Sequence, residues 1–153
     1  MEQQIKDYIN QLPEFKKLNY EIITCQKGHK DIPEIKDNKI GIYIYAYKGQ
    51  YLKIGKAWSK SEARWKYQHY NCNSSKSNLA ASIKNDKDFC TKNKIDREDD
   101  ENIKTWIKDN TTRINIVIQR ETNEKIAYFY LNLLEAWLHI KCNPKYEGYK
   151  TQR

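Results

Sequence analysis

One carboxylate lies within the apolar face of the last predicted helix, over residues 124–141. Glu135 follows Leu131 by four residues and precedes Leu138 by three, so the three side chains share one helix face. Burying a carboxylate is costly unless a cation meets it. Two kinds of partner would satisfy Glu135: a Lys or Arg side chain in an ordinary ion pair, or a divalent cation such as Mg²⁺, which prefers carboxylate oxygen.

A phenol and an ammonium group lie ten residues apart on two successive predicted strands. Tyr43 and Lys53 could meet across the hairpin, where a nearby cation favours the phenolate form of a tyrosine. A phenolate in contact with water could act as a general base. Taken singly, a strand tyrosine is more simply explained by packing and a strand lysine by contact with solvent. The pair therefore gains meaning only from the residues that surround it.

Three more candidate residues, Lys56, Arg64 and His69, follow within sixteen residues of Lys53. Lys53 and Lys56 could instead hold a phosphate. The planar guanidinium of Arg64 could clamp a phosphoryl oxygen. His69 carries an imidazole, which titrates near neutral pH. Together with Tyr43 and Glu135, these groups could bind a phosphate and move a proton beside it.

Charge is concentrated in the same part of the chain. The 153 residues carry a net charge of +8, and residues 41–80 hold seven Lys and Arg against one acid, Glu62. A local basic field rich in aromatic residues predicts an anionic polymer as partner. Four cysteines lack metal-knuckle spacing and are expected to be free thiols. No long apolar run or secretory signal is present, which predicts a cytoplasmic protein without a membrane span.

The elements that must position these residues alternate between strand and helix. Alternating Ile and Tyr over 40–47, a turn at 48–50 and a return strand over 51–56 predict a hairpin. In this hairpin Tyr51 is expected on the same face as Lys53. A helix is expected from a cap at Ser61 through His69, and the long helix is capped by Asn123.

Further elements are predicted before and after the hairpin, and their order indicates one small α+β domain with helices flanking a short antiparallel sheet. The stretch 85–100 is expected to be a surface loop. The other expected elements are a helix over 1–11, a short strand or extended segment over 18–24, helical turns from Leu79 capped by Ser77 or Asn78, a helix over 101–109 and a strand over 111–119.

Two tripeptides give this pattern a resemblance. Gly41-Ile42-Tyr43, the ten-residue step to Lys53-Ile54-Gly55, Arg64 on a helix and Glu135 on a late helix resemble the GIY-YIG nuclease superfamily. Lys53 stands where the superfamily usually has a second tyrosine. A lysine at this position resembles a restriction-enzyme branch of the superfamily. The longer pattern KIGKA…ARWKYQHYN…SNLAASI…NLLEAWLHIKCNPKYEG is similar to small bacterial and phage proteins of the superfamily.

The resemblance covers roughly residues 40–149 and implies a three-stranded antiparallel sheet flanked by helices. Residues 1–39 would then be an N-terminal extension and 150–153 a tail of a single domain spanning 1–153. It also implies a metal-dependent DNA endonuclease, either restriction-like or carried by a phage or mobile element. Double-stranded DNA would be the partner, and cutting both strands would require a homodimer or two successive visits.

The resemblance further implies a role for each candidate. Glu135 would hold one Mg²⁺ or Mn²⁺ ion, and Tyr43 would take the proton from the attacking water. Lys53 and Lys56 would assist Tyr43, and Arg64 would neutralise charge on the phosphate. The remaining candidate, His69, would assist Tyr43 or contact phosphate.

Other side chains are candidates for contact with DNA. Lys60, Lys66 and Lys76 are expected to contact phosphates, which positions DNA without reading its sequence. Tyr70 is a candidate for stacking on a base, with Trp58, Trp65 and Tyr67, although two or three of these four are expected in the core. The alternatives are a non-catalytic DNA-binding module of the same fold and a structural role, for which the sequence offers no long exposed apolar stripe.

Overall fold

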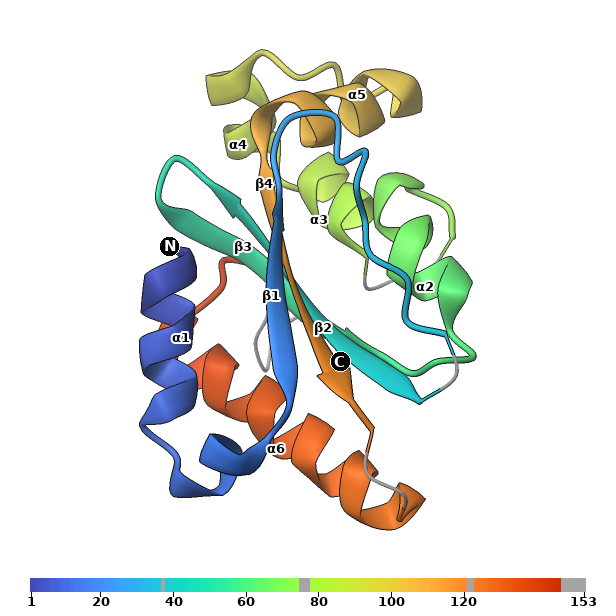
Figure 1. Cartoon of the computed structure of the whole chain (residues 1–153). Coiled ribbons are helices and arrows are strands. Elements are labelled where there is room, and N and C mark those ends of the chain that lie inside the picture. Colours follow the sequence, from blue (N-terminus) through green and yellow to red (C-terminus); the bar gives the residue numbers. More distant parts are fainter. Residues whose placement is uncertain (37, 75–77, 121–122, 147–153) are drawn as a thin grey trace.

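The chain folds into a four-stranded antiparallel sheet with helices on both faces, as seen in a computed structural model that describes residues 1–36, 38–74, 78–120 and 123–146. The strand order is β1-β4-β2-β3, which leaves β1 and β3 at the two edges (Figure 1). The α+β class is confirmed. The strands are β1 (Tyr20–Cys25), β2 (Lys39–Tyr47), β3 (Gln50–Ala57) and β4 (Thr112–Gln119).

Helices cover the two faces of the sheet in different ways. The first helix and the last helix pack on one face, and the helices between β3 and β4 pack on the other (Figure 1). The elements are α1 (Glu2–Asn10), the 3₁₀ helix η1 (Pro13–Lys17), α2 (Glu62–Lys66), the 3₁₀ helix η2 (Gln68–Tyr70), α3 (Leu79–Asn85), α4 (Lys87–Asn93), α5 (Asp100–Asn110) and α6 (Glu124–Cys142).

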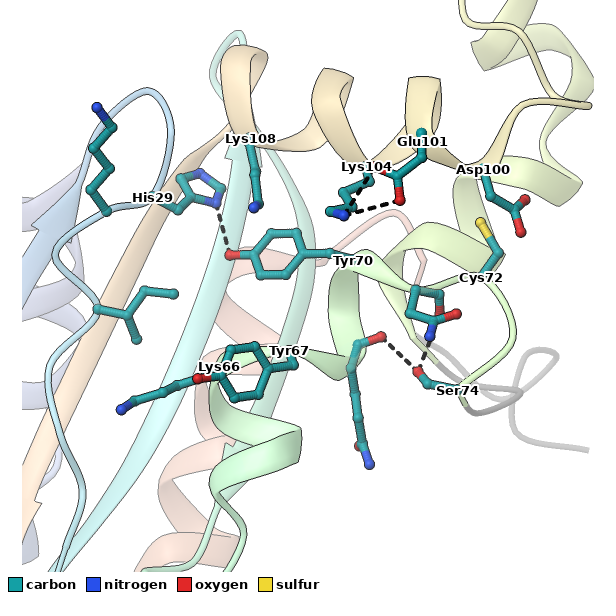
Figure 2. A pocket seen from close by; sticks show the side chains of 14 residues that line it. His29, Lys66, Tyr67, Tyr70, Cys72, Ser74, Asp100, Glu101, Lys104 and Lys108 are labelled. Atoms are coloured by element: carbon teal, nitrogen blue, oxygen red, sulfur yellow. Dashed lines mark hydrogen bonds and ion pairs between the residues drawn. The ribbon is translucent and has the colours of Figure 1, made fainter.

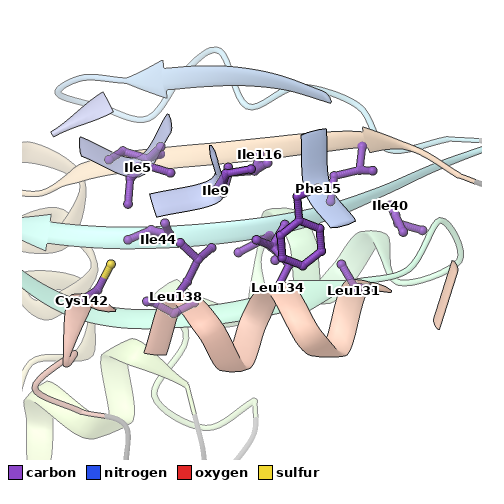
Figure 3. Close-up of a cluster of buried hydrophobic side chains, with 14 of the residues drawn as sticks. Ile5, Ile9, Phe15, Ile40, Ile44, Ile116, Leu131, Leu134, Leu138 and Cys142 are labelled. Carbon is purple, nitrogen blue, oxygen red and sulfur yellow. The ribbon is translucent and has the colours of Figure 1, made fainter. Parts of the chain in front are cut away.

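The face covered by α1 and α6 is an aliphatic core. Strand alternation sends Ile42 and Ile44 of β2 to the side of Leu134 and Leu138 of α6. Figure 3 shows Ile44, Leu134 and Leu138 in this core. All four side chains are at most 1% exposed, and burying each contributes about 1.5–3 kcal/mol of transfer free energy. This core fixes α6 against the sheet and so fixes the position of Glu135.

The face covered by α2 to α5 is aromatic and partly polar. Tyr43 and Tyr45 of β2 point to this side and pack with Trp65 of α2. Lys53 and Arg113 are buried on the sheet beneath these helices. Burying such polar groups is tolerated only when partners satisfy them, so this face is the one to search for a functional site.

The β2–β3 hairpin has the expected turn but an irregular register. Lys48 and Gly49 both have positive φ, 46° and 82°, as a two-residue type I′ turn requires. A bulge between Tyr45 and Ala46 lets Tyr51 pair with Ala46 while Lys53 pairs with Tyr45. The expectation that Tyr51 and Lys53 share a face is therefore wrong, because Tyr51 packs in the aliphatic core.

The predicted three-stranded sheet is wrong because β1 adds a fourth strand. Its residues pair with β4 from Tyr20↔Ile118 to Cys25↔Arg113. The segment 1–39 thus supplies an edge strand, and its helix α1 buries Ile5 and Ile9 in the aliphatic core. Likewise, the loop expected over 85–100 contains α4.

Helix ends follow the sequence in most places. Asn78 and Asn123 cap α3 and α6 through their side chains, as predicted. Ser61 precedes α2 without making a side-chain cap bond, and α2 ends at Lys66, where the helix expected through His69 gives way to η2. The four cysteines are free thiols. Among the described helices, none combines the length and apolarity that a membrane crossing needs.

Candidate functional site

The two glycines of the GIY and KIG tripeptides lie beneath aromatic rings. Gly55 is the register partner of Tyr43, and a Cβ built on Gly55 would lie 2.2 Å from the Tyr43 hydroxyl oxygen. A Cβ on Gly41 would lie 2.6 Å from the Trp65 ring. Neither site can hold a larger residue without movement of the ring above it. The glycines therefore set the height of Tyr43 and Trp65 over the sheet.

Tyr43 is held on every side. Its ring is fully buried, lies 4.2 Å from the His69 ring between centroids, and meets Trp65 edge to face. Its hydroxyl oxygen accepts a hydrogen bond of 3.4 Å from Nε of Arg64. Because Arg64 is exposed, this hydroxyl lies where a buried ring meets a surface guanidinium.

His69 is buried among cations. Burial is the main reason that the pKa of His69 lies well below its usual range, and the charges of Arg113, Lys53 and Arg64 lower it further. The imidazole is therefore neutral at physiological pH. Because the charges of Lys53 and Arg64 act on the His69 imidazole, both side chains lie near it. The structure therefore brings them together with His69 and Tyr43, as expected.

Arg113 of β4 organises the floor of this cluster and was missed by the sequence analysis. Its guanidinium is fully buried and donates to the carbonyl of Trp65 at 2.6 Å and to the Tyr45 hydroxyl at 3.1 Å. It also donates to Oδ1 of Asn115 at 2.8 Å. Arg113 and Asn115 alternate with Ile114 and Ile116 on β4, so the period of two in this strand was a usable signal.

Glu135 lies on the other face of the sheet. It forms an ion pair with Lys56 of β3, and the amide oxygen of Asn132, one turn earlier on α6, accepts a hydrogen bond from the same ammonium. The sequence predicted either a basic side chain or a divalent cation as the partner of Glu135, and in the structure the partner is a lysine. Lys53 and Lys56, which were predicted to hold one phosphate together, point to opposite faces because they are three positions apart on a strand.

Edge strand β3 joins the two halves of the candidate site. Gly55 lies against the Tyr43 hydroxyl on one face, and the next residue, Lys56, holds Glu135 on the other. Since β3 is at the edge of the sheet, Gly55 and Lys56 lie where its two faces meet, while farther along the strand the backbone N–H groups of Lys145 and Tyr146 donate to the carbonyls of Tyr51 and Leu52. The expected convergence is therefore partial: the phenol, the guanidinium and the imidazole form one cluster, and the acid lies across the strand edge from it.

The expected DNA-binding residues are distributed unevenly. Lys60 is exposed in the turn before α2, and Lys66 is half-buried and paired with Glu62 at 3.0 Å. Tyr70 is only 6% exposed and lies in the core with Trp65, whereas the side chain of Tyr67 is exposed and that of Trp58 is half-buried. Lys76 lies outside the described residues.

The oxygen atoms that face Lys56 suit a hard cation. A carboxylate and an amide oxygen, one helical turn apart, already converge on one positive charge, and Mg²⁺ prefers such ligands. Within the described parts of the chain, no group of three or more His, Cys, Asp or Glu residues is arranged to hold a metal ion. A divalent ion here would thus be held by Glu135 and Asn132, with water completing its coordination.

Comparison of the chain with protein-family models, with curated proteins and with solved structures gives no match.

Proposed function

We propose that the protein is a metal-dependent DNA endonuclease of the GIY-YIG type, restriction-like or carried by a phage or mobile element and acting in the cytoplasm. The observation that carries the proposal is the arrangement around Gly55 and Lys56 of edge strand β3. A fixed tyrosine hydroxyl with an exposed guanidinium lies on one side, and a half-buried glutamate lies on the other. A phosphodiester strand running along this edge would meet both.

Each residue then has a chemical task. Tyr43 acts as a phenolate beside Arg64 Nε, takes the proton from the attacking water and becomes the neutral phenol. The exposed guanidinium of Arg64 would face a non-bridging phosphate oxygen, where charge develops during in-line displacement. Lys53 adds positive charge beneath the phosphate, and neutral His69 fixes the ring of Tyr43 by packing against it.

The metal site would lie at Glu135. A divalent ion held there by Glu135 and Asn132 would supply Lewis-acid stabilisation to a phosphate oxygen and to the leaving oxygen. Lys56 currently neutralises Glu135, so in the loaded state its ammonium would be free to contact the DNA backbone. The products expected are 5′-phosphate and 3′-hydroxyl ends.

A non-catalytic module of the same fold is the alternative. Binding alone gives no reason to keep a half-buried carboxylate across the strand edge from a buried tyrosine. A structural role gains one feature that the sequence analysis overlooked. Helix α6 exposes an apolar stripe because only one of its faces meets the sheet, so the expectation of no such stripe is wrong. The stripe consists of Ile126, Phe129, Leu133 and Ile140.

Plasmid cleavage tests the proposal. The wild type with Mg²⁺ should nick or linearise plasmid DNA, EDTA should stop it, and Glu135→Ala should lose at least about 10²-fold in rate while still binding DNA. Glu124→Ala is the matched control, because this acid is on the same helix but its side chain is 71% exposed and pairs, among the described residues, with Arg120 four residues earlier. Equal rates for wild type and Glu135→Ala would refute the role of Glu135.

A further inference from the structure

A pocket of about 830 Å³ lies beside the candidate site, on the same face of the sheet as Tyr43. Helix α5 forms one wall, and the turn between α2 and η2 forms another (Figure 2). Its floor is the Tyr70 hydroxyl, which lies 2.9 Å from Nδ1 of His29, while Nε2 of His29 donates to the Thr111 carbonyl at 2.8 Å. These bonds fix one tautomer, in which Tyr70 donates to His29.

The floor is rigid and uncharged. Burial is the main cause that lowers the pKa of His29 to about 4, so the imidazole is neutral near pH 7. The Tyr70 hydroxyl also accepts from Tyr45 at 3.3 Å and from Arg113 at 3.4 Å. The polar atoms of the floor are thus used within the protein, which leaves recognition to the walls.

The walls carry cations and an aromatic ring. Four lysines line the pocket against two acids, and Lys30 and Lys108 form no ion pair with any described carboxylate. The Lys108 ammonium lies over the Tyr70 ring, 5.3 Å from its centroid. Tyr67 is 63% exposed at the pocket, although a ring of this size is usually packed in a core. A nucleotide is recognised by cations that contact its phosphate and by an exposed aromatic ring that stacks on its base, and the pocket walls offer both.

The size and position of the pocket limit which ligands it can hold. A volume of this order suits one small ligand, so a single nucleotide fits and a duplex does not. Lys66, Tyr67 and Tyr70 belong to the same nine-residue segment, 62–70, as Arg64 and His69. A nucleotide in the pocket would therefore be a close neighbour of a phosphate held by Arg64.

We propose that the pocket receives an unpaired or extruded nucleotide of the DNA strand beside the scissile phosphate, with its base stacked on Tyr67 and its phosphate near Lys108. This inference rests on the proposed endonuclease function and specifies its substrate as DNA with a locally open base pair. Taking a base out of the stack costs free energy, and that cost is smallest at a mismatch or bulge. The protein should accordingly prefer such sites.

Binding measurements without cleavage test this proposal. All variants are made on a Glu135→Gln background in EDTA, and two short duplexes are compared, fully paired and with one bulged 2-aminopurine. The parent should bind the bulged duplex at least about tenfold more tightly, with a change in 2-aminopurine fluorescence. Tyr67→Ala should remove the preference and the signal, since stacking on one aromatic ring contributes about that much to binding. Lys108→Ala should reduce the salt dependence of binding by about one phosphate contact.

Tyr128→Ala is the matched control, because this ring is 54% exposed on α6, outside the pocket. It should keep both the preference and the fluorescence change. Equal affinity for the two duplexes, or an unchanged preference in Tyr67→Ala, would overturn the pocket proposal and leave the endonuclease to be judged by plasmid cleavage. Failure to bind either duplex would overturn both.

Discussion

Replacing Gly55 with alanine should damage activity more than stability, because the new methyl group meets the Tyr43 hydroxyl. The Cβ would lie 2.2 Å from the hydroxyl oxygen and 2.5 Å from Cζ, whereas ordinary contacts begin near 3.4 Å. The ring must therefore rise by about 1 Å. It cannot do so freely, since it is fully buried and its centroid lies 4.2 Å from that of His69.

The expected magnitudes follow from that displacement. Forcing one methyl group into a packed core costs about 1–3 kcal/mol of unfolding free energy. A misplacement of about 1 Å in a catalytic group can cost about 10²-fold in rate. Gly55→Ala should therefore remain folded in a urea titration while its plasmid cleavage rate, measured with Mg²⁺ well below the unfolding temperature, falls by about 10²-fold.

Gly41→Ala is the matched control. Its Cβ would lie 2.6 Å from the Trp65 ring, so overpacking on the same face is comparable, but it does not touch Tyr43. It should lose similar stability and much less activity. A double-mutant cycle sharpens the test: on a Tyr43→Phe background, Gly55→Ala should add little further loss, because both changes act on one hydroxyl. A wild-type rate in Gly55→Ala, or equal losses in both glycine variants, would refute the reasoning.

Two further predictions concern the buried polar groups. The pKa of His29 is about 4 in the folded chain and 6.5 ordinarily, so the unfolded chain binds the proton more readily. The contribution of neutral His29 to the free energy of unfolding is therefore present above about pH 6.5 and is lost as the pH falls toward 4, by about 3 kcal/mol in all. Urea unfolding at pH 7.5 and 4.5 should show this slope, to which buried His69 adds in the same direction, and His29→Asn should reduce it; an identical slope in the variant would contradict the assignment. Arg113→Met should lower the unfolding free energy by about 2–3 kcal/mol, because it strands the Trp65 carbonyl, and Arg113→Lys should recover only part of that loss; unchanged urea midpoints would count against it.

Local periodicity predicted most elements because each depended on neighbours in sequence. The Ile and Tyr alternation of β2, the Lys48–Gly49 turn and the Asn123 cap are decided within a few residues. The strand β1 was only half recognised, since an extended segment becomes a strand only when a distant edge is free to pair with it. That edge belongs to β4, about ninety residues later.

The candidate cluster was found by residue type, but its shape was not. Arg113 was not among the predicted site residues. The isoleucines that alternate with it pack in the aliphatic core, and this alternation assigns Arg113 to the opposite, aromatic face. The bulge in the hairpin could not be foreseen, because it depends on how Tyr51 and Leu52 pack on opposite faces. A one-residue irregularity therefore changed the face assigned to Tyr51.

The position of Glu135 follows from a conflict between two local rules. Helical spacing puts it among leucines, which argues for burial, while a carboxylate requires a cation. The fold satisfies both by placing this turn of α6 at an edge strand, where Lys56 can reach it and solvent remains near. An acid in the middle of the sheet would be neutralised permanently by its partner. At the edge, under the proposed function, a divalent cation would take the place of the lysine ammonium at Glu135.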